Sequence, residues 1–216
     1  MRHTLRITPV LLALLLPSGV LFIQGCASKR GAEALHAQGC CADEIEYYSK
    51  TIEEARNKTG QEARDDTLWM VHYNRAIAYM QAGKYAKAIA DFTTTIKLHP
   101  YDKDAHVNRG IAYHNLNDYD KAMEDYAKAI ELDPDYAADA YFNRARIHYR
   151  LDDYHSALVD YDQAIKMNPN LAVAYHNRAL VHATLENHEA AEKDARKACE
   201  LGECGALETL KKQVDK

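Results

Sequence analysis

The sequence predicts an all-α protein, a solenoid of about five stacked helical hairpins closed by a capping helix. Three observations predict this fold class. The tripeptide Asn-Arg-(Ala/Gly) begins at positions 74, 108, 143 and 177, a period of 34 to 35 residues. Small and aromatic residues recur at fixed distances from each copy, and prolines at positions 100, 134 and 169 close three copies. A period of this length accommodates one helical hairpin, which buries its apolar face by stacking on its neighbours.

The first helix of each hairpin is predicted around the tripeptide. A small residue ends the tripeptide and a ring-bearing residue follows one turn later, so both lie on one face of the helix. The small residues are Ala76, Gly110, Ala145 and Ala179, and the ring-bearing residues are Tyr79, Tyr113, His148 and His182.

The second helix is predicted from another small residue, which is followed in three copies by a larger residue four positions later. These pairs are Ala88 and Phe92, Ala122 and Tyr126, Ala157 and Tyr161, and Ala191 with the smaller Ala195. Small residues let two helices approach closely, and proline ends the second helix because it cannot continue the hydrogen-bond ladder. We therefore predict four repeats near residues 69–102, 103–136, 137–171 and 172–204.

A fifth, degenerate hairpin is predicted upstream, over residues 32–58. This segment aligns with the first full repeat when Gly39 is placed over Gly83, the turn residue of that repeat, and Tyr48 then lies over Phe92. The solenoid is accordingly expected to span residues 32–204.

The chain beyond the solenoid, residues 205–216, is predicted to form the capping helix. Leu207, Leu210 and Val214 share one helical face there. The end of a solenoid needs such a helix, with a polar outer face, to cover the last repeat.

The first 25 residues have the pattern of an export signal. Arg2 and Arg6 precede an apolar run from Val10 to Ile23, which contains Pro17 and is shorter than the roughly 20 residues that span a bilayer. The Ile-Gln-Gly-Cys sequence that ends at Cys26 resembles the lipobox of bacterial lipoproteins, with an ordinary cleaved signal as the alternative.

The lipobox resemblance implies a lipid-anchored mature protein. Cys26 would be the acylated first residue, residues 26–31 a short tether, and the membrane partner would be contacted through the N-terminal lipid. Ala27 follows the cysteine, which resembles the sorting pattern for the outer membrane, so we expect the protein to face the periplasm.

The repeats resemble the tetratricopeptide repeat in period, small-residue sites, aromatic sites and terminal proline. The resemblance implies a right-handed superhelix that binds other proteins and has no catalytic activity. Two features depart from the family pattern. Histidine or tyrosine stands at the early aromatic site in place of tryptophan, and arginine stands at a site usually held by leucine.

The resemblance also places a partner-binding groove on the inner face, which the first helices form. Four asparagines of this face are candidates for hydrogen bonds to a peptide backbone, with a scaffold role as the alternative. The third repeat adds two aromatic residues and two arginines. The predicted groove residues are Asn74, Asn108, Asn143, Asn177, Phe142, Arg146, Tyr149 and Arg150. The lysines of the family's carboxylate clamp are missing, because Met70, Asp104, Asp139 and Val173 take those places.

Each tripeptide arginine has a matching aspartate in its second helix. The pairs are Arg75 and Asp91, Arg109 and Asp125, Arg144 and Asp160, and Arg178 and Asp194. We interpret them as a structural charge ladder, within or between repeats, with a ligand-binding role as the alternative.

The sequence predicts no catalytic residues, no cofactor and no metal site. No two of the 11 histidines are three or four residues apart, and glycine-rich phosphate loops are absent.

Cys199 and Cys204 flank Gly202 and are candidates for a disulfide in an oxidising compartment. The net charge of −5 does not favour a nucleic-acid partner, and no small-molecule substrate is indicated.

These observations predict a membrane-anchored scaffold that binds proteins or peptide segments of the bacterial envelope. The nearest type is the small lipoprotein of this repeat family that helps to assemble a secretin, a pilus or a cell-wall enzyme complex. The alternative is a lipoprotein that binds cell-wall glycan or peptide through the tyrosines and arginines of its inner face.

Overall fold

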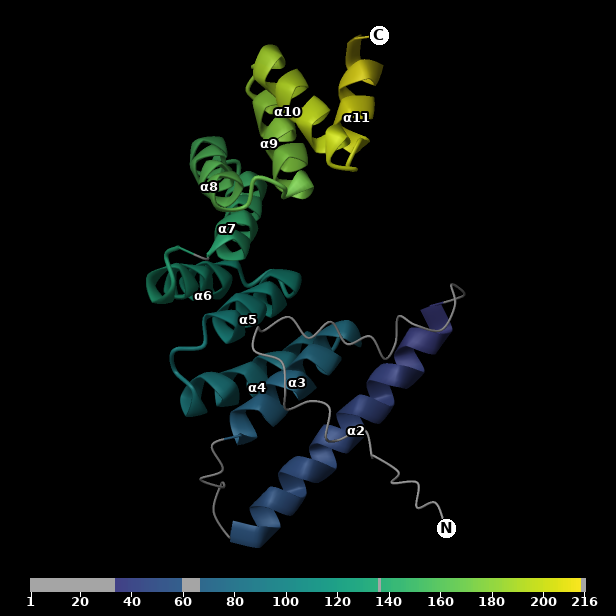
Figure 1. The fold of residues 1–216 in the computed structure, drawn as a ribbon, viewed down its shortest axis with the longest axis vertical. Coiled ribbons are helices and arrows are strands. Elements are labelled where there is room, and N and C mark those ends of the chain that lie inside the picture. The colour runs from purple at the N-terminus through teal and green to yellow at the C-terminus, as the bar shows by residue number, and fades with distance from the viewer. Residues whose placement is uncertain (1–33, 60–66, 136, 215–216) are drawn as a thin grey trace, which may run out of the picture. The chain divides into compact units, whose positions relative to one another are not determined.

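The computed structural model describes residues 34–59, 67–135 and 137–214, which form ten helices, α2 to α11, and no strand (Figure 1). The export signal 1–25, Cys26 and the tether to residue 31 lie outside the described residues. The described residues from Cys41 onwards belong to one compact unit. In the described part of the chain, no helix combines the length and the apolar character needed to cross a bilayer.

Eight of the helices form four hairpins at the predicted places. The hairpins are α3 (Leu68–Gln81) with α4 (Tyr85–Leu98), α5 (Lys103–Asn115) with α6 (Tyr119–Leu132), α7 (Ala138–Arg150) with α8 (Tyr154–Met167), and α9 (Ala172–Thr184) with α10 (His188–Glu200). Within a hairpin the two helices pack along each other, and the second helix also packs on the first helix of the next hairpin. The first helices α3, α5, α7 and α9 contact one another in sequence.

The capping helix, α11 (Gly205–Val214), packs on α9 and α10. Ala206 is fully buried there against Ala179 and Ala195, and its backbone N–H donates to His176 Nδ1 at 3.2 Å. The last hairpin is therefore covered on its open side, as the apolar face of residues 205–214 predicts.

The predicted degenerate hairpin at 32–58 is not a hairpin. The segment is one continuous helix, α2 (Ala34–Thr59), which passes through Gly39 without a turn. A single glycine weakens a helix by about 1 kcal/mol but does not end it, and this segment has no proline to stop the ladder. Its second half still keeps the predicted register, because Arg75 Nη1 donates to Ser49 Oγ at 3.1 Å.

The core of each of the first three hairpins is built from small residues around one large side chain, whereas Ala195 takes that place in the fourth. Phe92, Tyr126 and Tyr161 are at most 1% exposed and pack in clusters with buried alanines. Gly110 stands where the other repeats have alanine, and a Cβ there would lie 2.6 Å from Cε1 of Tyr126. The second hairpin therefore needs glycine at this position.

Every first helix ends in the same left-handed turn. The turn residue has a positive φ and is followed by a backbone N–H that donates to a carbonyl five residues earlier, for example Lys84 to Tyr79 at 2.8 Å. The turn residues are Gly83, Asn117, Asp152 and Glu186, and Gly202 makes the same turn before α11. Three of the five turns thus hold a side chain in a conformation that glycine adopts more readily.

Candidate functional site: two hollows on either side of the third hairpin

The four predicted asparagines occupy equivalent places on α3, α5, α7 and α9, but two of them already serve the scaffold. Asn108 Nδ2 donates to Tyr73 Oη and to the Asp104 carbonyl, both at 2.9 Å. Asn143 is 7% exposed and donates to the Asp139 carbonyl at 2.8 Å. The scaffold interpretation therefore describes these two residues.

Arg146 and Arg150 lie one turn apart on α7, and both are exposed. Each guanidinium lies over an aromatic ring at 5.8 Å from its centroid, Arg146 over Phe142 and Arg150 over Tyr119. Arg146 Nη1 also donates to Asn143 Oδ1 at 3.1 Å. Among the described residues, no carboxylate forms an ion pair with either arginine. The two like charges are thus left next to each other without an acidic partner of their own.

Two hollows meet at this pair of arginines. The α5/α7 hollow has a volume of about 210 Å³ and the α7/α9 hollow about 200 Å³. The α5/α7 hollow is lined by Ile111, His114, Asn115, Asn117, Arg146 and Arg150. The α7/α9 hollow is lined by Arg146, Tyr149, Arg150, Tyr161, Asn177 and Leu180. The structure therefore brings together Arg146, Tyr149, Arg150 and Asn177 of the predicted groove, while Asn74, Asn108, Asn143 and Phe142 do not line either hollow.

Six lining residues were not among the eight predicted groove residues, namely Ile111, His114, Asn115, Asn117, Tyr161 and Leu180. For two of them, the sequence pattern indicated a different role. Tyr161 occupies the aromatic site of the second helix, which indicates a core residue, and it is only 1% exposed. Asn117 is the turn residue after α5, with a φ of 60°. A left-handed asparagine at a helix end is a signal of the turn itself, so the pattern contained no sign that its side chain reaches the hollow.

His114 forms one wall of the α5/α7 hollow and is 9% exposed. Its ring contacts Tyr119 edge to face, with centroids 5.6 Å apart. Burial lowers the pKa of His114, and the positive charges of Arg146 and Arg150 lower this pKa further. The imidazole is therefore neutral at pH 7 and presents both an N–H donor and a nitrogen acceptor.

The charge ladder lies within each hairpin, which settles the alternative left open by the sequence. In all four hairpins the arginine of the first helix donates twice to a buried aspartate of the second helix. The Nε and Nη2 distances are 2.7 and 2.7 Å for Arg75 and Asp91, 2.9 and 2.7 Å for Arg109 and Asp125, 2.7 and 2.7 Å for Arg144 and Asp160, and 2.6 and 2.7 Å for Arg178 and Asp194.

The remaining nitrogen, Nη1, connects three of these arginines to a preceding helix, Arg75 to Ser49 of α2 and the other two to the second helix of the preceding hairpin. Arg109 Nη1 donates to Thr93 Oγ1 at 3.1 Å, and Arg178 Nη1 pairs with Asp162. Arg144 has no such bond in the described part of the chain, because Ala127 stands at the equivalent place on α6. The joint between the second and third hairpins therefore lacks one polar connection.

Two of the ladder aspartates, Asp91 and Asp125, remain ionised inside their hairpins. Burial alone would raise the pKa of Asp125, but the two bonds from Arg109 and the ring of His106, with Nδ1 3.0 Å from Asp125 Oδ1, hold this pKa below its usual range. Asp91 is in the same situation, with lowered pKa, beside Arg75 and His72. Their bonding capacity is used inside the hairpins, so these carboxylates belong to the scaffold and not to a binding site.

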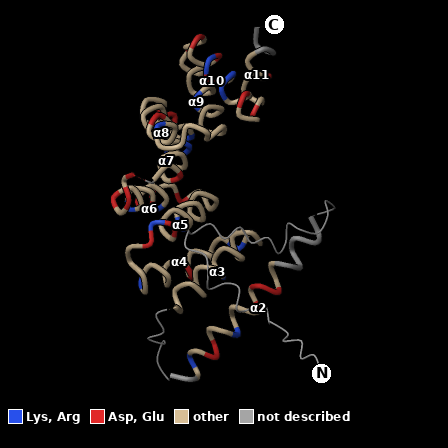
Figure 2. The backbone as a smooth tube through the Cα atoms, in the orientation of Figure 1, with Lys and Arg blue, Asp and Glu red and all other residues tan. Residues whose placement is uncertain are grey.

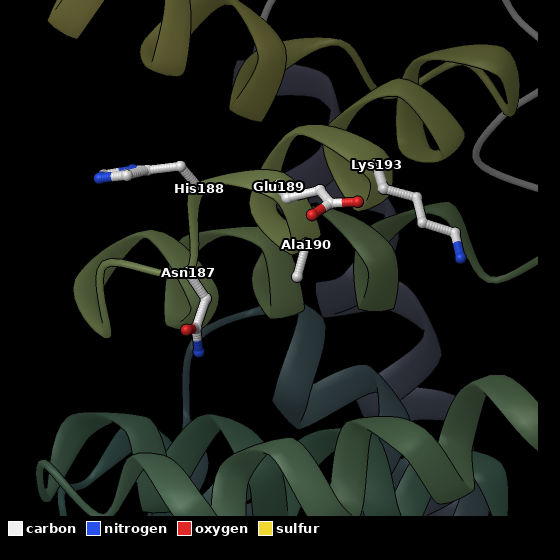
Figure 3. A pocket seen from close by; sticks show the side chains of 5 residues that line it. All are labelled: Asn187, His188, Glu189, Ala190 and Lys193. Atoms are coloured by element: carbon white, nitrogen blue, oxygen red, sulfur yellow. The ribbon is translucent and has the colours of Figure 1, made fainter.

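A third hollow, of about 440 Å³, lies at the start of α10 and is lined by Asn187, His188, Glu189, Ala190 and Lys193. Figure 3 shows that the side chains of this hollow point in different directions and do not converge on one point. The described residues contain no group of three or more histidine, cysteine or acidic side chains placed to hold a metal ion. Volume alone therefore does not make this hollow the better candidate.

Cys199 and Cys204 are joined by a disulfide that spans the turn between α10 and α11. Cys41 is a free, buried thiol whose Sγ contacts Gln81 Oε1 at 3.5 Å.

Figure 2 shows acidic and basic residues interspersed along the hairpins, without a continuous basic stripe.

Stacked helical hairpins with open hollows along their first helices define a helical-repeat scaffold. Family models described as "Tetratricopeptide repeat" match residues 73–137, 138–171 and 172–201, which together make up more than half of the chain. The chain belongs to the tetratricopeptide repeat family. No curated protein matches the sequence at a significant level.

Solved structures share the fold. The crystal structure of MamA is similar with a TM-score of 0.64 and 20% identity, over 80% of this chain and 96% of that chain. MamA 41-end from Desulfovibrio magneticus RS-1 has a TM-score of 0.58 and 17% identity, over 74% and 95%. The first TPR of Spaghetti (RPAP3) bound to the HSP90 peptide SRMEEVD has a TM-score of 0.54 and 26% identity, over 56% and 96%.

Proposed function

We propose that this protein is a non-catalytic scaffold that captures a segment of another protein along α5, α7 and α9. The observation that carries this proposal is the pair Arg146 and Arg150, which lies between two hollows without an acidic partner in the described chain. A bound acidic group would relieve the repulsion of two like charges one turn apart and accept bidentate hydrogen bonds.

The likeness to a peptide-bound relative supports capture of a peptide segment. The first TPR of Spaghetti (RPAP3) is bound to the HSP90 peptide SRMEEVD, a short segment with more acidic than basic residues. The present chain lacks lysines at the clamp positions, so we do not propose a chaperone C-terminus as its partner. The arginines of α7 are the cations that this chain offers instead.

The membrane anchor is a separate part of the proposal. We propose that Cys26 is acylated and that the scaffold works in the bacterial envelope, at the outer membrane, where its partners are envelope proteins of a secretin, pilus or cell-wall enzyme assembly. The sequence that ends at Cys26 supports it. Cys26→Ser should abolish acyl labelling and leave the precursor unprocessed, and labelling that persists would refute the anchor.

The binding site is tested by capture of partners from solubilised envelope with the full chain as bait. Arg146→Glu with Arg150→Glu should weaken capture tenfold or more, about 1.4 kcal/mol, with the melting temperature nearly unchanged. The matched control is Lys87→Glu with Lys166→Glu, two exposed lysines on the second helices α4 and α8 that line none of the three hollows. Equal capture by the arginine variant and the control would place the site elsewhere.

The glycan alternative has its own assay. Tyr149 lines the α7/α9 hollow and is partly exposed, so its ring offers a surface on which a sugar can stack. Sedimentation with purified cell wall, in the absence of other proteins, would support the alternative, and protein capture without sedimentation would favour the scaffold.

A further inference from the structure

The two hollows beside Arg146 and Arg150 differ in chemistry. The α5/α7 hollow presents mostly polar groups, the His114 ring and the side-chain amides of Asn115 and Asn117. The α7/α9 hollow presents the partly exposed ring of Tyr149 and the alkyl chain of Leu180, with the buried ring of Tyr161 behind them. One side of the arginine pair is therefore suited to a charged group and the other to an apolar side chain.

The polar side is built to accept an anion. Two guanidinium groups and two amides supply hydrogen-bond donors, and the neutral ring of His114 supplies an N–H. The residues that line the hollow include no carboxylate to compete for these donors. A carboxylate entering here would find both charge neutralisation and directional bonds.

A second observation shows that the hydrogen bonds around Arg146 are incomplete. The Tyr126 hydroxyl is fully buried and has no hydrogen-bond partner among the described residues, whereas the side chain of Asn177 lowers the pKa of Tyr161, the equivalent residue of the next hairpin. Asn143, the equivalent of Asn177, is instead held by Arg146. If Arg146 turned towards a ligand, Asn143 Oδ1 would be released as an acceptor.

We propose that the two hollows form one bipartite site for an extended peptide segment, with a carboxylate in the α5/α7 hollow and a bulky apolar side chain in the α7/α9 hollow. The inference rests on the proposed function and names the chemistry of its partner. The hollows lie on opposite sides of α7, about 8 to 10 Å apart if neighbouring first helices pack at ordinary distances. At about 3.3 Å per residue, the acidic and apolar residues stand two or three positions apart.

The segment is identified by selecting from random dodecapeptides displayed on phage, with the full chain as target. The expected result is enrichment of peptides with Asp or Glu two or three positions from Leu, Ile, Phe or Met. Enrichment of peptides without an acidic residue, or no enrichment at all, would overturn the inference. The selected peptide is then synthesised with acetylated and amidated ends, so that its only carboxylates are side chains.

A double-mutant cycle tests the carboxylate contact without depending on one variant. Replacing the peptide's acid by its amide should weaken binding to the unaltered protein at least tenfold, and binding to Arg146→Gln with Arg150→Gln less than twofold. Equal losses on both proteins would overturn the contact. The same comparison for the apolar residue, changed to Ala in the peptide and tested on Leu180→Ala, examines the α7/α9 hollow.

Two further measurements complete the test. One identifies the source of the carboxylate, and the other separates a failure of the bipartite inference from a failure of the proposed function. An amide-substituted peptide with a free C-terminus that regains affinity would assign the carboxylate to a chain end, and one that does not would assign it to a side chain. If selected peptides bind Arg146→Glu with Arg150→Glu as tightly as the unaltered protein, the site of the proposed function fails as well. If binding needs the arginines but not the acid, only the bipartite inference fails.

Discussion

Replacement of Tyr126 by phenylalanine should stabilise the protein, although it removes a polar group from a buried tyrosine. The Tyr126 hydroxyl is completely buried and has no hydrogen-bond partner in the described part of the chain. A buried polar group without a partner destabilises a folded protein by about 1 to 3 kcal/mol. Removing the oxygen while keeping the ring should therefore raise the free energy of unfolding by about 0.5 to 1.5 kcal/mol.

Tyr161→Phe is the matched comparison, because this tyrosine has the same place in the next hairpin and the same burial. Burial raises the pKa of both phenols, so both are neutral at pH 7, and the Asn177 side chain lowers the pKa of Tyr161 by interacting with its hydroxyl. Loss of this interaction should lower the free energy of unfolding by about 1 kcal/mol. The two substitutions are chemically identical and should have opposite signs.

Urea unfolding at 25 °C, followed by circular dichroism, measures both values. With a slope of about 2 kcal/mol per molar urea, each kcal/mol shifts the midpoint by about 0.5 M, provided that the slope is unchanged between variants. A decrease of 1 kcal/mol or more for Tyr126→Phe, like that expected for Tyr161→Phe, would refute the reasoning, because it would show that the Tyr126 hydroxyl is satisfied in solution.

Three further predictions concern stability. Gly110→Ala should lower the free energy of unfolding by about 1 to 2 kcal/mol, because the new Cβ would lie 2.6 Å from the Tyr126 ring; a more stable variant would show that the ring can move. Glu186→Gly should raise it by about 0.5 to 1 kcal/mol, because this turn residue has a φ of 59°, and a loss in thermal or urea unfolding would contradict the turn geometry. Asp91 and Asp125 have lowered pKa values in the folded state, so they contribute stability above their unfolded value near about 4, and this contribution is lost as the pH falls through the folded values. Asp125→Asn should reduce the slope of unfolding free energy against pH below about pH 5, and an unchanged slope would count against the buried ion pair.

Much of the fold could be predicted from the sequence because the same residue pattern recurs in all four hairpins. Small residues, rings and prolines at equivalent positions define where two helices approach and where the second one ends. The α2 segment was predicted wrongly because one alignment, Gly39 over Gly83, had to stand for a turn. A glycine permits a left-handed turn but does not require one, and of these two glycines Gly83 has a positive φ whereas Gly39 lies inside a helix.

The candidate site was less predictable than the fold. The arginine pair on α7 follows from sequence position, since residues four apart share a helix face. Which aspartate belongs to which arginine, and whether an asparagine is free or used by the scaffold, depends on distances between helices. The inclusion of Tyr161 in the wall of a hollow depends on the local spacing of α7 and α9, which no residue pattern specifies.

Ala127 offers no side-chain acceptor to Arg144, and this affects how the stack of hairpins unfolds. In a linear array, stability is approximately a sum of unit terms and nearest-neighbour terms, so a weak joint decides where the array divides. The joint between α6 and α7 lacks the arginine bond found at the neighbouring joints, and the unpaired Tyr126 hydroxyl belongs to the same pair of hairpins. A ligand in the α5/α7 hollow would touch both sides of this joint. A bound ligand would then connect the second hairpin to the third and make the two halves of the array unfold together.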